Sequence, residues 1–337
     1  MIGDVVIGPH SGLTRWVFDV VTRLAELAGR PVRVVDRHDP IRLEVGERPV
    51  FLTHYPSAAV IEAIERRSVT VTLVMEDSLD SVTYLRSALS KSVLEIVRAL
   101  TATSVANLAI AAAEDVLFID RGSERAIGEH VARLARQLGI DLGQISLADS
   151  GLTHGLDPVA STEALLAARG DHYAAPVRLG RSGAIDAEMM VAVDVVDPLL
   201  AFARGDFLRP VVWPTSVFKA YDRPDEPARK AIEVAGPARN IYYGPYFYLP
   251  PARYRVEVIL DFSDEISDVP FVLEMHGVTW LTKAKIEERR SGHYRGYFFF
   301  DHTNSEASVE IRLRNDRAVA KGSLSLIEML FFVQQSE

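Results

Sequence analysis

The sequence predicts an α/β protein in two parts. A parallel sheet with helices on both faces is expected over residues 1–205, and an antiparallel β-sandwich or jelly roll over residues 206–337. In the first part, short apolar runs alternate with stretches in which apolar residues recur every three to four positions, the pattern of strands joined by crossover helices. From about residue 206 the period shortens to two, as in half-buried antiparallel strands.

The first part begins with a strand at residues 5–7 and a helix at 13–27. Further strands are expected at 32–35, 50–52, 69–75 and 116–119, and further helices at 57–67, 77–89, 91–113 (in one or two pieces) and 124–138. Residues 141–183 predict a loop-rich segment and a candidate lid. Residues 188–204 predict a helix that Pro198 kinks or splits, because proline cannot continue the hydrogen-bond ladder.

The second part contains β-branched and aromatic runs separated by turn residues. Strands are expected at 241–249, 254–262, 271–276, 280–286, 294–300, 309–313 and 324–332. Val256, Val258 and Leu260 alternate with Glu257, Ile259 and Asp261, which is typical of a half-buried strand. Short strands at this spacing predict a sandwich.

The composition narrows the function classes. The 337 residues carry a formal net charge of −9, which argues against a nucleic-acid partner. The chain has no cysteine, which excludes disulfides, thiolate metal sites and a cysteine nucleophile, and fits a cytoplasmic location. No signal-peptide pattern is present, and the apolar run at 105–113 is too short to cross a bilayer, so no integral membrane segment is expected. A homo-oligomer is left open.

Residues 5–21 (VVIGPHSGLTRWVFDVV) combine a strand, a glycine-containing turn and the start of a helix. Such a turn directs several backbone N–H groups and a helix N-terminus at one point, which suits a phosphate or a sulfate. The stretch is not a Walker A loop, because Ile7 stands at the first glycine position and Leu13 at the lysine position. A tight turn that binds nothing is the alternative, and both remain open.

Three stretches, in this order, resemble the cytosolic sulfotransferases, which use 3′-phosphoadenosine 5′-phosphosulfate as donor. Residues 9–16 (PHSGLTRW) are similar to the Pro-Lys-Ser-Gly-Thr-Thr-Trp loop that holds the 5′ end of the donor. Residues 51–56 (FLTHYP) are similar to the Lys-Thr-His-Leu-Pro segment with the general base. Residues 71–85 resemble the strand and helix start that grip the 3′-phosphate, so the resemblance covers roughly residues 1–120.

The resemblance implies roles for particular residues. The donor would be bound by Ser11, Gly12, Leu13, Thr14 and Arg15. His54 would be the catalytic base, and protonated His10, or Arg15, would replace the missing loop lysine. Glu76 stands at the position of the 3′-phosphate arginine, where a carboxylate repels a phosphate. The usual donor would then need another cation there, and the candidates are Arg86, Lys91 and Arg181. The later Arg-Lys-Gly segment of the family has a candidate counterpart in residues 181–183.

Two further groups of residues have competing interpretations. Glu76, Asp77 and Asp80 could form a carboxylate cluster for a metal, but acids at a helix start more often complement the helix dipole, so no metal is predicted. The aromatic residues of the second part are either exposed platforms for sugar rings, as in a sandwich of carbohydrate-binding-module type, or sandwich core: Tyr242, Tyr243, Tyr246, Phe247, Tyr248 and Trp280. The basic patch at 287–295 is either a solvated hairpin or a contact for an acidic polysaccharide or a second subunit.

The predicted function is transfer of a sulfuryl group to a carbohydrate hydroxyl, in surface-polysaccharide assembly. The alternative is a non-catalytic carbohydrate-binding or assembly protein on a degenerate sulfotransferase scaffold. Ser11, Gly12 and His54 favour the enzyme, whereas His10 and Glu76 favour the alternative.

Overall fold

The computed structural model describes residues 3–36, 47–113, 115–121, 125–143, 147, 150–168, 186–228, 231–263, 270–286 and 291–334. The chain divides into two compact units. One comprises Met1–Ser92 and Ala106–Ile185, and the other comprises Val93–Val105 and Asp186–Glu337. The second unit therefore takes the first part of the long helix α4 (Val93–Ala111) from the middle of the first half of the sequence.

The first unit contains a five-stranded sheet whose strands all run parallel, in the order β2-β3-β1-β4-β5. The strands are β1 (Gly3–Ile7), β2 (Val32–Val34), β3 (Val50–Thr53), β4 (Val69–Met75) and β5 (Val116–Asp120). The central strand β1 pairs Val5 with Phe51 of β3 and with Val71 of β4. The carboxyl ends of β1, β3 and β4 therefore meet at one edge of the sheet.

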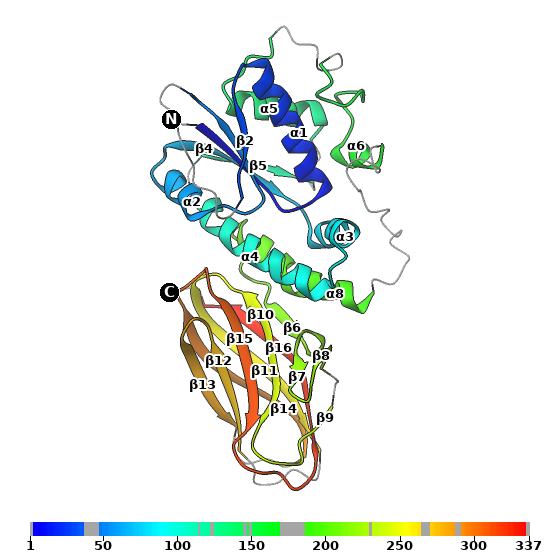
Figure 1. Ribbon diagram of the computed structural model, residues 1–337, viewed down its shortest axis with the longest axis vertical. Coiled ribbons are helices and arrows are strands. Elements are labelled where there is room, and N and C mark those ends of the chain that lie inside the picture. The colour runs from blue at the N-terminus through cyan, green and yellow to red at the C-terminus, as the bar shows by residue number, and fades with distance from the viewer. Residues whose placement is uncertain are drawn as a thin grey trace. The chain divides into compact units, whose positions relative to one another are not determined.

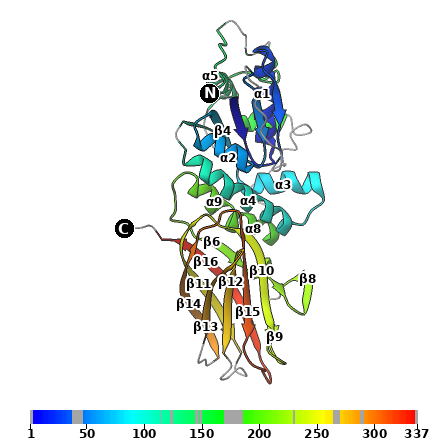
Figure 2. The ribbon, with the colours of Figure 1, turned by 60° about the vertical axis from the view of Figure 1, so that its left-hand side comes forward.

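Helices cover both faces of this sheet, as the sequence predicts (Figures 1 and 2). The helices of the described chain in this half are α1 (Gly12–Leu27), α2 (Ala58–Glu65), α3 (Ser78–Leu89), α4, α5 (Ile127–Gln137) and α6 (Thr162–Ala168). The crossover β1-α1-β2 runs along the sheet in one direction, whereas β3-α2-β4 runs in the other. Because parallel crossovers are right-handed, α1 and α2 lie on opposite faces. The loop after β1 is thus at the point where the winding reverses, the usual ligand position in such sheets.

The core on the α1 face is continuous from the strands to the helices. Trp16, Val20 and Leu24 of α1 pack with Val131 and Leu134 of α5, and all are buried. Val6, Leu52, Val74 and Ile119 contribute from the strands, and Leu165 and Leu166 from α6. The apolar spacing predicted for residues 13–27 therefore faces the sheet, and this packing fixes where the N-terminus of α1 points.

Several predicted elements are confirmed with shifted ends. The stretch predicted at 91–113 forms the single helix α4. Pro198 splits the stretch at 188–204 into α8 (Ala187–Val195) and α9 (Asp197–Phe202), since it lies in the first turn of α9. By length and composition α4 is apolar enough to cross a membrane, although more than half of it is buried within the protein. The loop-rich segment is described only in part, and residues 169–185 lie outside the described residues.

Besides these helical segments, the second unit contains an antiparallel sandwich of two sheets (Figures 1 and 2). One sheet has the order β13-β12-β15-β10-β7-β8 and the other β14-β11-β16-β6, with β9 paired to β16. The strands are β6 (Val211–Pro214), β7 (Lys219–Ala220), β8 (Arg223–Pro227), β9 (Ile232–Glu233), β10 (Asn240–Tyr248), β11 (Ala252–Phe262), β12 (Phe271–His276), β13 (Trp280–Ile286), β14 (Gly292–His302), β15 (Ser308–Asn315) and β16 (Ser323–Val333), and the helical turn η1 (Thr215–Val217) follows β6. The predicted strands from 241 onward correspond to β10–β16, whereas the short strands β6–β9 are absent from the prediction.

Candidate functional site

The turn between β1 and α1 is closely packed against the neighbouring strand. A Cβ atom at Gly8 would lie 2.5 Å from Thr14 Oγ1 and 2.8 Å from Val74 Cβ, so only glycine fits. Ser11 is the N-cap of α1: its Oγ accepts from the Thr14 N–H and donates to Thr14 Oγ1, both at 3.1 Å. The buried serine and threonine of the predicted donor loop therefore hold the helix start in place.

The loop also presents unpaired backbone donors. The Gly8 N–H donates to the Thr53 carbonyl, and the Arg15 N–H to the Ser11 carbonyl. Between them, the Thr14 N–H donates to Ser11 Oγ, and within the described part of the chain no acceptor is found for the backbone N–H groups of four residues: His10, Ser11, Gly12 and Leu13. Four such donors at the N-terminus of a 16-residue helix have the geometry that oxyanion binding requires.

Leu13 and Arg15 differ in what their side chains can contribute. The Leu13 side chain is fully buried in the α1 core, so only its backbone can meet a ligand. Arg15 is exposed in the first turn of α1 and has no ion-pair partner among the described residues. It is therefore the available cation nearest in sequence to the loop.

His54 lies against the same loop. It follows β3 directly, and its Nδ1 lies 3.0 Å from the Gly8 carbonyl oxygen. A carbonyl only accepts, so Nδ1 carries the proton and Nε2 has the lone pair in the neutral ring. Burial lowers the pKa of His54, an effect that its hydrogen bonds to the Gly8 and Pro9 backbone partly offset. His54 is thus neutral near pH 7, the state that a general base needs.

His10 stacks on His54, with ring centroids 3.7 Å apart and planes inclined by 27°. Desolvation of its ring, with the charge of His54 as a smaller cause, lowers the pKa of His10 to about 4. The ring is therefore neutral at pH 7. The replacement of the missing lysine by protonated His10 stays a prediction, and the lowered pKa argues against it at neutral pH, chiefly because of desolvation.

Glu76 is buried at the carboxyl end of β4, with 3% of its surface exposed. Its Oε1 lies 3.5 Å from Nη1 of Arg121, which follows β5 and also pairs with Asp80. Burial raises the pKa of Glu76 to about 8, an effect that Arg121 partly offsets and that Asp80 and Asp77 reinforce. The position at which the resemblance expects a phosphate-binding arginine thus holds a largely protonated carboxyl group.

Arg121 is the site residue that the sequence prediction missed. It follows the last strand of the sheet in an ordinary turn, and only the strand order β4-β5 brings it to Glu76. The two proposed substitute cations that the structure describes, Arg86 and Lys91, do not lie at Glu76. Arg86 lies nine residues beyond the cap Asp77, about 13 Å along α3. Lys91 is exposed beyond the end of that helix, and Arg181 and the rest of 181–183 lie outside the described residues.

The carboxylates of Glu76, Asp77 and Asp80 lie close enough to share a cation, with oxygens within 4.8 Å of one another. Arg121 already supplies a positive charge to Glu76 and Asp80, and Asp77 accepts the Asp80 N–H at 2.9 Å as the cap of α3. This donor set suits a guanidinium and a helix N-terminus.

The six aromatic residues that are candidate sugar platforms in the sandwich differ in how far they are buried. Tyr242 and Phe247 are fully buried, and Tyr243, Tyr246 and Tyr248 are half-buried. Trp280 is 59% exposed, and its Nε1 donates to the Thr282 carbonyl at 3.0 Å. The basic patch at 287–295 is described only from residue 291 onward.

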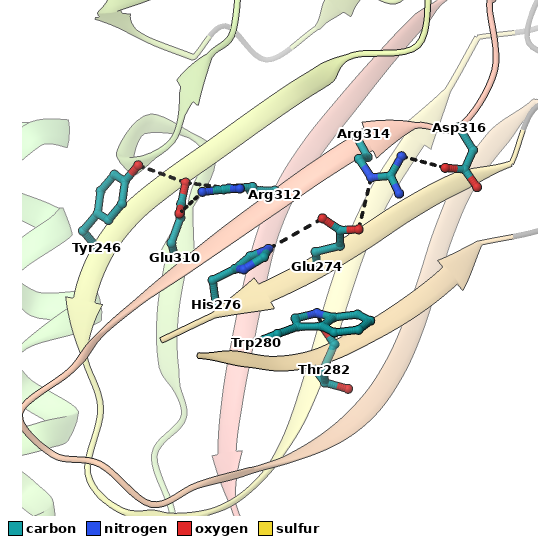
Figure 3. A network of polar contacts seen from close by, with 9 residues as sticks. All are labelled: Tyr246, Glu274, His276, Trp280, Thr282, Glu310, Arg312, Arg314 and Asp316. Atoms are coloured by element: carbon teal, nitrogen blue, oxygen red, sulfur yellow. Dashed lines mark hydrogen bonds and ion pairs between the residues drawn. The ribbon is translucent and has the colours of Figure 1, made fainter. Parts of the chain in front are cut away.

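A network of charged side chains lies beside Trp280 on the same sheet (Figure 3). Arg312 donates to both oxygens of Glu310 at 3.0 and 2.8 Å, and Tyr246 donates to the same carboxylate at 2.9 Å. Burial, with Glu310 as a second cause, raises the pKa of Tyr246 to about 12, so it remains a donor. No sequence motif marks this network, because Tyr246 lies on β10 whereas Glu310 and Arg312 lie on β15.

Comparisons with known proteins give partial likenesses. No family model matches the chain, and no curated protein matches it in sequence. Solved structures that resemble it include mouse sulfotransferase SULT7A1 complexed with PAP, at 14% identity and TM-score 0.34 over 46% of this chain and 66% of that chain. TmCBM61 in complex with β-1,4-galactotriose matches at 11% identity and TM-score 0.22, over 40% of this chain and 94% of that chain.

A family 16 carbohydrate-binding module matches at 14% identity and TM-score 0.24, over 36% of this chain and 84% of that chain. The chain spans just under two thirds of the sulfotransferase and most of the two modules. At these identities and scores the likenesses carry no argument about the site, whose chemistry therefore rests on the residues above.

Proposed function

We propose that the first unit transfers a sulfuryl group to a carbohydrate hydroxyl and that the sandwich binds the carbohydrate. One observation carries the proposal: four unpaired loop amides lie next to a neutral histidine that is hydrogen-bonded to the same loop. An oxyanion site beside a base is what in-line transfer to a hydroxyl requires.

In this proposal the loop amides donate to the sulfuryl oxygens, where negative charge is held during transfer. Nε2 of His54 takes the proton from the acceptor hydroxyl, whose oxygen receives the sulfuryl group as its bond to the donor phosphate breaks. Arg15 is the cation available to the leaving phosphate, since His10 is neutral.

The donor implied by the resemblance, 3′-phosphoadenosine 5′-phosphosulfate, fits this chain at one end. The loop of residues 8–14 fits its 5′ phosphosulfate. The Glu76 region does not fit its 3′-phosphate, since Arg121 is already paired with two carboxyl groups. We therefore expect weak binding of this donor, held mainly through the 5′ end.

Calorimetry with 3′-phosphoadenosine 5′-phosphate, followed by a sulfate-transfer assay on polysaccharide acceptors, tests the proposal. His54→Ala should lower turnover about a hundredfold while nucleotide binding persists. The matched control is His293→Ala, which removes an exposed histidine of β14 and should leave turnover unchanged. Equal activity of the His54→Ala and wild-type proteins would overturn the role of His54.

A second candidate is a non-catalytic carbohydrate-binding or assembly protein. Two observations favour it: His10 carries no charge at neutral pH, and Glu76 replaces a cation. Glu76→Gln and Glu76→Arg distinguish the candidates. Nucleotide binding that is absent from the wild-type protein and present in either variant indicates a degenerate site. Binding and transfer by the wild-type protein exclude the non-catalytic candidate.

We further propose a cytoplasmic location, self-association and a place in surface-polysaccharide assembly. Cell fractionation tests the location, and size-exclusion chromatography with light scattering tests self-association. The sulfate content of the surface polysaccharide in a deletion strain tests the place in assembly.

A further inference from the structure

One face of the six-stranded sheet carries an ordered set of charged side chains (Figure 3). On β12, Glu274 and His276 alternate with the buried Leu273 and Met275. On β15, the outer-face residues Glu310, Arg312 and Arg314 alternate with the buried Ile311 and Leu313. Because strand side chains alternate between faces, the charged residues stand together on the side away from the sandwich core.

The glutamate oxygens on this face are already used. Glu310 accepts from Arg312 through both oxygens and from Tyr246. Glu274 accepts from Nε of Arg314 at 3.1 Å, and its other oxygen lies 3.6 Å from His276 Nε2. These glutamates therefore hold the neighbouring cations in fixed positions and have little capacity left for a ligand.

The cations, in contrast, keep unused donors. Nη1 of Arg312 and Nη2 of Arg314 have no acceptor among the described residues. Lys283, which is paired with Glu274 in register on β13, is exposed and has no ion-pair partner in the described chain. A ligand on this face must therefore supply acceptors, and the strongest acceptors for guanidinium and ammonium groups are sulfate, phosphate and carboxylate oxygens.

Trp280 adds a flat apolar surface next to these donors. It is paired with His276 in register and is 59% exposed. The indole N–H is satisfied by the Thr282 carbonyl, so the ring offers its face and no free polar group. An exposed indole beside fixed hydrogen-bonding groups suits the apolar face of a pyranose ring.

The charge balance points in the same direction. Four cations lie on β13 and β15: Lys283, Lys285, Arg312 and Arg314. They stand against three carboxylates, those of Glu274 on β12, Glu310 on β15 and Asp316 directly after β15. The chain as a whole carries a net charge of −9. A cationic excess on one face of an acidic protein favours an anionic partner by charge complementarity.

We propose that this surface, called the cationic face and formed by Trp280, Lys283, Arg312 and Arg314, binds an acidic polysaccharide. Trp280 stacks on a sugar ring, and the three cations bind its sulfate or carboxylate groups. The proposal rests on the proposed function, because it makes the sandwich ligand a carbohydrate and specifies its charge. A polymer that already carries acidic groups, either the sulfated product or an acidic acceptor, is the ligand class.

Binding of the full chain to dextran sulfate and to dextran of the same length, compared by calorimetry, tests this. Dextran sulfate should bind at least tenfold tighter, and the difference should shrink as salt rises. Polygalacturonate as a third probe distinguishes carboxylate from sulfate as the recognised group. Trp280→Ala should weaken binding of dextran sulfate about tenfold, and Lys283→Gln about two- to fivefold.

Matched controls come from the other sheet. Tyr297→Ala on β14 removes an aromatic residue that is 69% exposed, and Arg253→Gln on β11 removes an exposed cation outside the 287–295 patch. Both should bind like the wild-type protein. Equal affinity for dextran and dextran sulfate overturns the proposal, as do losses in the controls that match those in Trp280→Ala and Lys283→Gln. Should Trp280→Ala not fold, the exposed Lys283→Gln decides.

Nucleotide binding measured on the same samples separates this proposal from the transfer reaction. Tight binding of dextran sulfate without any nucleotide binding or transfer contradicts the proposed transfer reaction and supports polysaccharide binding at the cationic face. Transfer activity with no preference for the sulfated polymer contradicts only the proposed binding at the cationic face.

Discussion

His54 Nδ1 and the Gly8 carbonyl oxygen lie 3.0 Å apart, although the two residues are 46 positions apart in the sequence. This contact joins the end of β3 to the loop that follows β1. It also fixes the tautomer of the imidazole, because a carbonyl accepts only from a protonated Nδ1. The orientation of the candidate base is thus set by the loop beside which it would act.

The activity of the protein should depend on pH through His54. Its pKa lies below the ordinary value of 6.5, chiefly because of burial, and a base works only when unprotonated. The rate should therefore fall as the pH is lowered, with a half-maximal rate below pH 6.5. The measurement is kcat/KM against pH with a saturating donor. A half-maximal rate at or above pH 6.5 would contradict this assignment.

Introducing a lysine at position 10 should strengthen anion binding at the loop. His10 is neutral at pH 7 because its pKa lies near 4, whereas an exposed lysine keeps its charge. His10→Lys should raise the affinity for 3′-phosphoadenosine 5′-phosphate several-fold at low salt, measured by calorimetry. His10→Gln, which is neutral like the wild-type ring, is the control. A gain of the same size in both variants would show that loss of the stacked ring, not charge, is responsible.

Gly8→Ala should destabilise the fold and disturb the loop. The added methyl would lie 2.5 Å from Thr14 Oγ1 and 2.8 Å from Val74 Cβ, so either the loop or β4 must move. The free energy of unfolding should fall by about 1–3 kcal/mol in chemical denaturation. Gly296→Ala is the control, since no atom lies within 4 Å of the added methyl. A loss below 0.5 kcal/mol (roughly the range of neutral surface changes) would mean that the turn is more adaptable than its contacts indicate.

Glu76 should make stability fall as pH rises. Its pKa is about 8 in the folded chain and near 4.5 when exposed, so the folded state binds more protons between these values. The contribution of Glu76 protonation to the free energy of unfolding is complete below about pH 4.5, declines progressively up to pH 8 and then levels off. Chemical denaturation of the wild-type protein and of Glu76→Gln at pH 5, 7 and 9 measures this contribution. The variant should lose less stability over this range, by on the order of 1 kcal/mol or more. Parallel pH profiles would place the Glu76 pKa near its ordinary value.

The longer helices and strands, and which of the two each stretch forms, can be predicted from the sequence. Helical and two-residue periods are local properties, so the parallel sheet in the first part and β10–β16 in the second part are readable from the chain. The effect of Pro198 is also local, because proline removes a hydrogen bond wherever it stands in a helix. The strands β6–β9 escape this reasoning because two to five residues are too few to show a period.

Tertiary structure alone decided which side chains meet and which are buried. Tyr242 and Trp280 both lie in aromatic strands, yet one is enclosed in the core and the other faces solvent at a sheet edge. Arg121 reaches Glu76 because β5 is placed next to β4, and Arg314 reaches Glu274 because β15 lies beside β12. Strand order and register arise from packing across the whole unit, which minimises exposed apolar surface, and no local pattern encodes them.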